Sequence, residues 1–324
     1  MKAVVQYTYG PPEVLEVREI EPPAIGDDGV LIRVHAASVN AYDWHMMTGK
    51  PYLARLQGGL RRPKRQVPGV DVAGTVEAVG RNVTEFRPGD EVWGTCGGAY
   101  AEYARATEER LVLKPANATF EQAAAMPIAA ITALQGLRDH GHVQAGQEVL
   151  INGASGGVGT FAVQISKSLG AHVTGVCSTR NVESARSIGA EHVIDYTRED
   201  FTRAGQRYDL ILDIAGNHSM RAIRRVLVPA GIYVGVGSAK IGDWVGPLID
   251  LLKVKLASIG RSQQMGGFLA AITKEDLTVL QGLLQAGDVS PVIDRRYELG
   301  DTAEALRRQG EGHAQGKQVI VVRG

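Results

Sequence analysis

The feature that most constrains this chain is the segment VLINGASGGVG at residues 149–159. A short apolar run ends in a loop of small residues, and apolar residues then recur at helical spacing. In such a strand–loop–helix the free N–H groups and the positive end of the helix dipole face one point, which suits a pyrophosphate. We expect Gly156 to let the backbone approach the phosphates and Gly159 to let the helix pack closely on the strand. The alternative is a tight strand-to-helix turn without a ligand.

The flanking sequence completes a βαβ unit. Residues 147–152 read as a buried parallel strand, the helix should end near Gly170 in a left-handed conformation, and residues 172–176 read as the next strand. Ala154 stands where the usual fingerprint has its first glycine, so the pattern is Ala-x-Gly-x-x-Gly. This context predicts a dinucleotide site.

The residues after the second strand favour NADP(H) over NAD(H). An acidic residue there would bind the ribose 2′-hydroxyl, but the chain has Ser178, Thr179 and Arg180, and its next carboxylate is Glu183. Two hydroxyls and a guanidinium suit a 2′-phosphate. Alternatively, Arg180 is a solvated side chain and Asn181 is the N-cap of the next helix.

Composition sets wider limits. The length of 324 residues predicts about two domains. The formal net charge of zero argues against a nucleic-acid or membrane partner. No apolar run reaches the ~18 residues of a membrane-spanning helix, and the N-terminal residues predict a strand rather than a signal peptide. The two cysteines, Cys96 and Cys177, cannot form a disulfide framework. A cytoplasmic protein with a small-molecule substrate is expected.

The pattern of predicted secondary structure changes along the chain. Residues 1–115 predict short strands separated by Gly and Pro turns, one of them at residues 99–103, and so a β-rich, barrel-like domain. An Ala-rich helix is expected at residues 123–137, followed by βα alternation and a final strand at residues 318–322. We expect the C-terminal tail to return to the first domain, leaving a cleft between the domains for nicotinamide and substrate.

Two further motifs have competing interpretations. The basic run at residues 61–65 could bind nucleic acid or act as a localisation signal, but zero net charge and Pro63 favour a solvated loop. His140 and His142 could form a metal-binding pair, although solvent-facing histidines before the nucleotide strand need no ligand role.

These motifs together resemble the medium-chain dehydrogenase/reductase superfamily, in particular its zinc-free quinone oxidoreductase branch. Residues 39–44 (VNAYDW) resemble the segment with the active-site Asn and Asp of that branch, and residues 68–80 (PGVDVAGTVEAVG) match the barrel signature. Residues 125–127 and 132–133 match the helix that enters the cofactor domain. The resemblance implies a GroES-like β-barrel domain (1–120 and 265–324), a Rossmann doubly wound parallel-sheet domain (121–264) and a homodimer.

The resemblance also implies roles for single residues. Asn40 and Thr132 would lie near the nicotinamide, Ser178, Thr179 and Arg180 would bind the 2′-phosphate, and Lys317 would contact the cofactor unless it is a surface lysine. The remaining expected cofactor-binding residues are Ala154, Ser155, Gly156, Gly157, Val158, Gly159, Gly235, Val236 and Gly237.

A catalytic zinc is not expected. It needs about three ligands at one point, whereas the early segment has Asn40 and Asp43 without a cysteine, and Asp71 stands in the triplet where the zinc branch has Gly-His-Glu. His45 and Asp71 could meet in space, but two such residues make a poor site.

Without a metal to stabilise an alkoxide, a quinone or an α,β-unsaturated carbonyl is the expected substrate. The proton would come from Tyr52, His45 or water, with Asn40 and Asp43 beside the reacting groups. The alternatives are a metal-free alcohol or aldehyde dehydrogenase and a non-catalytic NADPH-binding protein. Candidates for an apolar pocket are Trp44, Met46, Met47, Trp93, Trp244 and Phe268.

Overall fold

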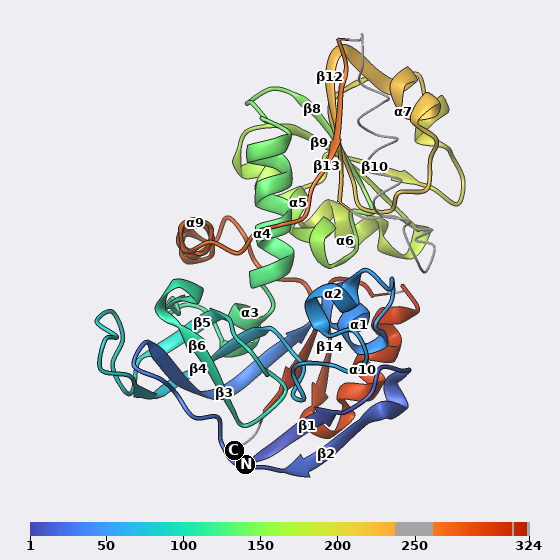
Figure 1. The fold of residues 1–324 in the computed structure, drawn as a ribbon. Coiled ribbons are helices and arrows are strands. Elements are labelled where there is room, and N and C mark those ends of the chain that lie inside the picture. Colours follow the sequence, from blue (N-terminus) through green and yellow to red (C-terminus); the bar gives the residue numbers. More distant parts are fainter. Residues whose placement is uncertain (237–261, 313, 323–324) are drawn as a thin grey trace. The chain divides into compact units, whose positions relative to one another are not determined.

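The computed structural model describes residues 1–236, 262–312 and 314–322 (Figure 1). The chain forms two compact units: unit 1 comprises Met1–Ile131 and Ile272–Gly324, and unit 2 comprises Thr132–Ala271. The sequence placed these boundaries after residues 120 and 264. Gly237 and Trp244, which were expected near the nicotinamide and in the substrate pocket, lie outside the described residues.

Unit 2 is built on a six-stranded parallel sheet with strand order β10-β9-β8-β11-β12-β13. From β8 the chain adds strands on one side, then returns to add β11 to β13 on the other, which is the doubly wound Rossmann order. The strands are β8 (Glu148–Asn152), β9 (His172–Cys177), β10 (His192–Asp195), β11 (Tyr208–Asp213), β12 (Leu227–Gly235) and β13 (Gln264–Gly267). Their apolar residues are largely buried, as expected of a parallel sheet covered on both faces.

The connecting helices of unit 2 begin close to strand ends. They are α5 (Gly157–Ser168), α6 (Val182–Ser187) and α7 (Met220–Val226). Gly170 follows α5 with a φ of 81°, the left-handed conformation that the sequence predicted.

Unit 1 contains a seven-stranded sheet of order β14-β15-β3-β4-β5-β7, with β6 paired to β3, and a separate β1–β2 pair. The C-terminal strand β15 runs antiparallel to β3, so the end of the chain completes the sheet of the first domain. The strands are β1 (Lys2–Gln6), β2 (Leu15–Glu19), β3 (Gly29–Val39), β4 (Asp71–Val79), β5 (Glu91–Thr95), β6 (Tyr103–Thr107), β7 (Leu111–Leu113), β14 (Ile293–Glu298) and β15 (Lys317–Val321).

Short helices surround this sheet. Thr119 and Thr273 cap α3 and α9 by accepting a backbone hydrogen bond in the first turn. The helices are α1 (Ala41–Thr48), α2 (Ala54–Gly58), α3 (Phe120–Ala124), α4 (Pro127–Gln135, which ends in unit 2), α9 (Lys274–Ala286) and α10 (Thr302–Gly310). None of the helices in the described ranges is long and apolar enough to span a bilayer.

Two predicted elements were wrong. The single helix at residues 123–137 is two helices, because Pro127 lacks an N–H and instead starts α4, and a π-helical turn (Gly136–His140) follows. The strand predicted at residues 99–103 begins instead at Tyr103. The residues before Tyr103 that were expected in this strand form hydrogen bonds to loops and to β1 instead. For example, the Tyr100 N–H donates to the Pro68 carbonyl.

Candidate active site

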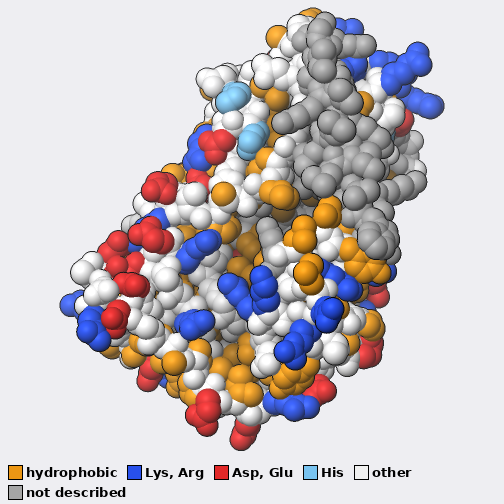
Figure 2. Space-filling view, viewed as in Figure 1, with side chains coloured by type: hydrophobic (Ala, Val, Ile, Leu, Met, Phe, Trp, Pro, Cys, Tyr) orange, Lys and Arg blue, Asp and Glu red, His pale blue; other side chains and the backbone are white. Residues whose placement is uncertain are grey.

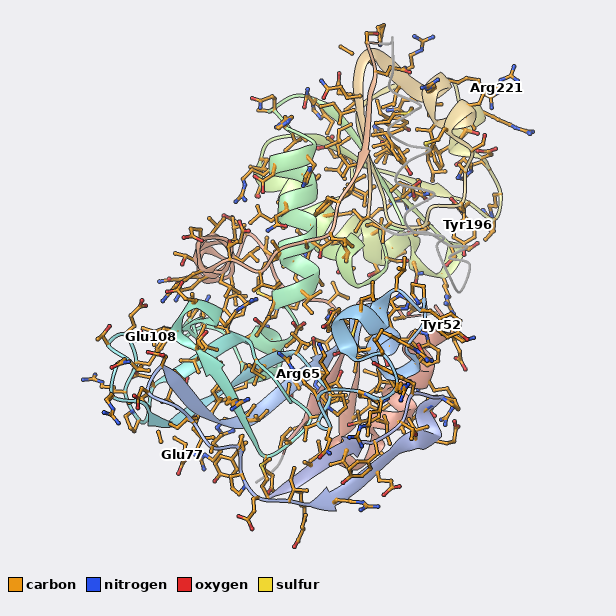
Figure 3. All side chains as sticks on the ribbon, viewed as in Figure 1. Tyr52, Arg65, Glu77, Glu108, Tyr196 and Arg221 are labelled. Atoms are coloured by element: carbon orange, nitrogen blue, oxygen red, sulfur yellow. The ribbon has the colours of Figure 1, made fainter. Side chains whose placement is uncertain are left out.

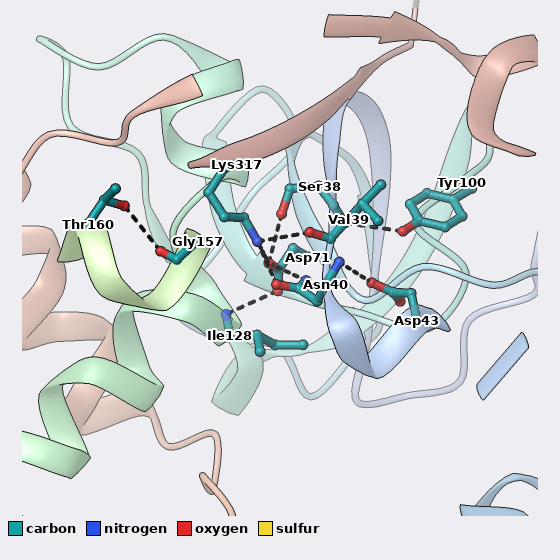
Figure 4. A network of polar contacts seen from close by, with 10 residues as sticks. All are labelled: Ser38, Val39, Asn40, Asp43, Asp71, Tyr100, Ile128, Gly157, Thr160 and Lys317. Atoms are coloured by element: carbon teal, nitrogen blue, oxygen red, sulfur yellow. Dashed lines mark hydrogen bonds and ion pairs between the residues drawn. The ribbon is translucent and has the colours of Figure 1, made fainter. Parts of the chain in front are cut away.

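A buried polar cluster lies where three strands of unit 1 meet (Figure 4). We call Ser38, Asn40, Asp71 and Lys317 the Asp71 network. Asp71 Oδ2 accepts hydrogen bonds from Ser38 Oγ (2.9 Å) and Asn40 Nδ2 (2.8 Å), and Asp71 Oδ1 accepts one from the Ile128 N–H (3.2 Å). Lys317 Nζ donates to Asn40 Oδ1 (2.5 Å) and the Val39 carbonyl (3.1 Å), and lies 3.7 Å from Asp71 Oδ2.

Sheet register explains how distant residues meet. Ser38 pairs with Asp71 across β3 and β4, and Val39 pairs with Gln318 across β3 and β15. The first residue of β4, the last of β3 and the first of β15 therefore come together at one end of the sheet. Asn40 directly follows β3, so its side chain enters the same place.

The network contains an ion pair that is almost completely shielded from solvent. Asp71 is 0% exposed and Lys317 is 2% exposed. Burial lowers the pKa of the Lys317 ammonium and raises that of the Asp71 carboxyl, and the opposite charge of the partner opposes each shift. The Ser38 and Asn40 hydrogen bonds also favour the ionised carboxylate. Each charged group therefore depends on its partner.

Asp43 is a second buried carboxyl beside this network. It is the third residue of α1, and its Oδ2 accepts the N–H of Asn40 (2.9 Å), which is half of a capping box. Burial, followed by the charge of Asp71, raises the pKa of Asp43 to about 7. Asp43 thus changes charge near neutral pH while holding the start of α1.

This pKa predicts a pH-dependent stability. The folded carboxyl titrates near 7 and the unfolded one near 3.8, so the folded state binds more protons between these values. Its contribution is complete below about pH 4 and is lost as the pH rises to about 7, by at most about 1.4 kcal/mol per pH unit. We expect Asp43→Asn to flatten this part of the curve of unfolding free energy against pH, measured by urea titration. Parallel curves for both proteins would contradict the assignment.

Two of the three candidate catalytic residues lie in or next to the network. Asn40 belongs to it and Asp43 lies beside it, whereas Tyr52 (labelled in Figure 3) lies on the turn before α2. The Arg55 guanidinium lies 4.7 Å from the centroid of the Tyr52 ring. The interpretation of Lys317 as a surface lysine was wrong, because β15 begins one residue earlier than predicted and draws it into the sheet. His45 Nδ1 bonds to the Lys50 carbonyl, and no contact with Asp71 occurs in the described residues.

The glycine loop of unit 2 has the geometry that the sequence predicted. A Cβ on Gly159 would lie 2.0 Å from the Gly153 carbonyl oxygen, so only glycine permits this approach of helix to loop. Gly153 itself has a φ of 95°. Gly156 is the N-cap of α5 and has no side chain to cap it, which leaves first-turn N–H groups for a ligand.

The loop after β9 contacts the glycine loop through Asn181. Its Nδ2 donates to Ser155 Oγ (3.0 Å) and Ser178 Oγ (3.1 Å), and no side-chain cap bond to α6 forms. Asn181 thus occupies the N-cap position of α6, as the alternative interpretation had it, but its amide joins the two loops instead of capping the helix. Arg180 is exposed and has no ion-pair partner among the residues described.

Thr179 is held by a carboxylate that the local sequence did not suggest. Its Oγ1 donates to Asp195 Oδ2 (2.6 Å), at the end of the neighbouring strand β10. This bond is the main cause that lowers the pKa of Asp195, so the group is an anion at neutral pH. Because the Thr179 hydroxyl already donates its proton to Asp195, Ser178 and Arg180 are better placed to donate hydrogen bonds to a 2′-phosphate.

A further candidate position, which was not singled out from the sequence, lies at the point where the strand order reverses. Asn152 ends β8 and Asp213 ends β11, and Asn152 Nδ2 donates to Asp213 Oδ1 (2.8 Å). The Tyr233 hydroxyl donates to Asp213 Oδ2 (3.1 Å). Ligands of doubly wound sheets bind at this reversal. The sequence contained one indication of this pair, because both apolar strands end in a polar residue.

Several expected pocket residues belong to the core. Met47 and Trp93 are fully buried within unit 1, so this part of the pocket prediction was wrong. Trp44 packs against the core and lies close to Gly310. Phe268 stacks on His140 with ring centroids 4.3 Å apart. Within the described ranges, no group of three or more His, Cys, Asp or Glu side chains could hold a metal ion.

Comparison with known proteins agrees with this architecture. A family model described as alcohol dehydrogenase GroES-like domain matches residues 26–116, and one described as zinc-binding dehydrogenase matches residues 188–320. A Pseudomonas aeruginosa quinone oxidoreductase is 32% identical over 326 residues, with 97% of each chain covered. A 2-methylene-furan-3-one reductase of Solanum lycopersicum is 32% identical over 337 residues, covering 99% of this chain and 79% of the relative.

A solved structure gives the same result. The Escherichia coli quinone oxidoreductase complexed with NADPH superposes with a TM-score of 0.83 at 25% identity, covering 99% of this chain and 100% of that one. The fold therefore combines a GroES-like domain with a Rossmann domain, as the sequence predicted. The chain belongs to the medium-chain dehydrogenase/reductase superfamily, in its quinone oxidoreductase branch.

Proposed function

We propose that this protein uses NADPH to reduce a quinone or another α,β-unsaturated carbonyl compound without a metal ion. The observation that carries the proposal is the glycine loop of unit 2, in a chain related to quinone oxidoreductases along its whole length. The tomato relative, named as a reductase of a conjugated ketone, supports the wider substrate class.

The residues present fit NADPH. The first-turn N–H groups of α5 would hold the pyrophosphate along residues 154–159, while Ser178 and Arg180 would hold the 2′-phosphate. Thr132, Gly235 and Val236 are proposed on the nicotinamide side, by the family resemblance. When bound, the nicotinamide supplies the hydride.

The chain itself must orient the substrate and supply a proton. Reduction of a conjugated carbonyl places negative charge on its oxygen, which hydrogen-bond donors stabilise. We propose Tyr52 as the proton donor, with water as the alternative. Asn40 is fixed through both ends of its amide, by Asp71 and Lys317, and keeps one N–H for a ligand. Lys317 is thus a positioning residue rather than a direct cofactor ligand.

Zinc independence rests on how the candidate ligands are used. Asp71 is bonded to Ser38, Asn40 and the Ile128 N–H, and His45 is bonded to a carbonyl. Cys96 is buried, which raises the pKa of its thiol and disfavours the thiolate that zinc requires. These donors do not form a zinc site in their present arrangement.

A panel assay tests the proposal. We expect chelator-treated protein to consume NADPH with quinones and enones, at the rate of untreated protein, and to leave simple alcohols with NADP unreacted. Activity that is lost with stoichiometric zinc would contradict metal independence. Alcohol oxidation alone would indicate a metal-free dehydrogenase, and tight NADPH binding without turnover would indicate a non-catalytic protein.

Cofactor choice has its own test. We expect Arg180→Ala to raise KM for NADPH by about 10- to 100-fold, because a charge-assisted hydrogen bond contributes about 1.5–3 kcal/mol. KM for NADH should stay within about twofold, since NADH has no 2′-phosphate. Arg207→Ala, which removes an exposed cation elsewhere in unit 2, is the control. Equal effects on both cofactors would contradict the role of Arg180.

The resemblance also leads us to propose a cytoplasmic homodimer.

A further inference from the structure

The basic run at residues 61–65 is the strongest feature that the proposed function does not use. Between Asp43 and Asp71 the sequence has no acidic residue and six Lys or Arg residues, although the whole chain is neutral. Arg61, Arg62, Lys64 and Arg65 are all exposed, and none of them forms an ion pair within the described part of the chain. Arg55, by contrast, bonds to the Gly49 carbonyl and lies over the Tyr9 and Tyr52 rings.

The run lies on a loop with a defined shape, which we call the basic loop (residues 59–66). The Lys64 N–H donates to the Gly58 carbonyl (2.7 Å) and closes the loop. The Tyr9 hydroxyl donates to the Gly59 carbonyl (2.6 Å), and the Gln6 N–H of β1 donates to the Gln66 carbonyl (2.7 Å). Both ends are therefore tied to the body of unit 1, and the charged tip between them is displayed to solvent.

Large apolar side chains accompany these charges. Leu60 at the tip is 69% exposed, and Leu56 on the preceding helix α2 is 65% exposed. Only Leu269 is more exposed among the large apolar residues described. Figure 2 shows blue and orange side chains interspersed across the middle of unit 1, with red ones toward its edges, and Figure 3 places Arg65 in this area.

A hollow adjoins the charged residues. It has a volume of about 360 Å³ and is lined by Tyr7, Arg62, Pro63, Lys64 and Gln66. Arg62 and Lys64, which have no ion-pair partner in the described ranges, lie beside an aromatic ring and suit a singly charged phosphate group. Most of the residues that line the hollow belong to the basic loop, whose tip carries Leu60.

We propose that the basic loop docks this protein on an anionic lipid surface, with lipid phosphates at Arg62 and Lys64 and with Leu56 and Leu60 among the acyl chains. Adjacent cations and exposed aliphatic side chains are the combination that binds proteins to membrane interfaces. Nucleic acid would use the cations but gain little from two exposed leucines, because its bases stack on aromatic or guanidinium groups. The proposal does not depend on the enzymatic activity.

Vesicle co-sedimentation tests the docking. We expect the full chain to bind phosphatidylcholine vesicles that contain phosphatidylglycerol, less tightly as salt rises, and not to bind phosphatidylcholine alone. Each cation near such a surface is worth about a fivefold change in partitioning. The triple variant Arg61→Gln, Arg62→Gln, Lys64→Gln should therefore partition roughly 100-fold less, with an unchanged Tm.

Two further variants make the test specific. Leu60→Ser should weaken partitioning without changing its salt dependence. The matched control removes three exposed cations of unit 2 that form no ion pair with any described residue, by Arg207→Gln, Arg221→Gln and Arg225→Gln, and should bind as the unaltered chain does. Absence of binding, equal binding to neutral vesicles, or an equal loss in the control would overturn the proposal. So would binding of single-stranded RNA as tight as vesicle binding and unaffected by Leu60→Ser.

Discussion

Lys317→Met is expected to lower the free energy of unfolding by about 3–5 kcal/mol and to abolish most of the activity. Removing one partner of a buried ion pair leaves the other charge without compensation, and this cost is far larger than that of a surface pair. Asp71, which is 0% exposed, would keep its hydrogen bonds to Ser38 and Asn40 but lose its only nearby cation in the described residues. Urea unfolding at neutral pH measures the loss.

A double-mutant cycle separates this pair from a general packing effect. Lys317→Met with Asp71→Asn should unfold at a higher urea concentration than Lys317→Met alone, because neither position of the pair then carries an uncompensated buried charge. Lys274→Met is the matched control. Lys274 pairs with Glu85 at the surface of the same unit, so its loss should cost less than about 1 kcal/mol. Equal costs for the two lysines, or additive effects in the cycle, would contradict the paired network.

The same double variant tests whether Lys317 positions Asn40. If the pair only stabilises the fold, a folded double variant should have normal turnover. We expect turnover to remain low, because the amide of Asn40 would lose its bond to Nζ and could rotate. NADPH affinity, measured by fluorescence, should change less than kcat, since the residues proposed to bind the phosphates lie in unit 2.

The sequence predicted those parts of the molecule whose signal is local. The strand, glycine loop and helix at residues 147–170 lie next to one another in the chain, and each has its own periodicity or turn residue. The break at Pro127 was also visible locally, but the Ala-rich composition on both sides outweighed it. Errors of this kind shift the end of a helix or strand by only a few residues.

The Asp71 network could not be predicted in this way. Ser38, Asp71 and Lys317 are separated by long stretches of chain, and only the register of three strands brings them together. Taken alone, Asp71 suggested a weak metal ligand, and Lys317 suggested a cofactor contact or a surface lysine. The contact between Thr179 and Asp195 was missed for the same reason, because it joins the ends of two neighbouring strands.

Gly159→Ala is expected to lower both stability and NADPH affinity. The added methyl group would lie 2.0 Å from the Gly153 carbonyl oxygen and 2.9 Å from the backbone of Ala154, and neither can move without displacing the loop or α5. Such overpacking typically costs about 1–3 kcal/mol. The displaced N–H groups would no longer converge, so we expect NADPH to bind roughly 100-fold less tightly. Thermal unfolding and fluorescence titration measure the two effects.

Gly156→Ala, three residues earlier, is the matched control. A Cβ there would meet only the Gly153 oxygen, at 3.6 Å, and Gly156 has a φ of −82°, which alanine adopts readily. This variant should unfold as the unaltered chain does while still binding NADPH less well, because its methyl group would point toward the proposed phosphates. Stability lost at Gly159 alone, with affinity lost at both glycines, would distinguish a packing requirement from a phosphate contact. If both variants kept full affinity, the loop would not be the pyrophosphate site, and the turn would serve only to join β8 to α5.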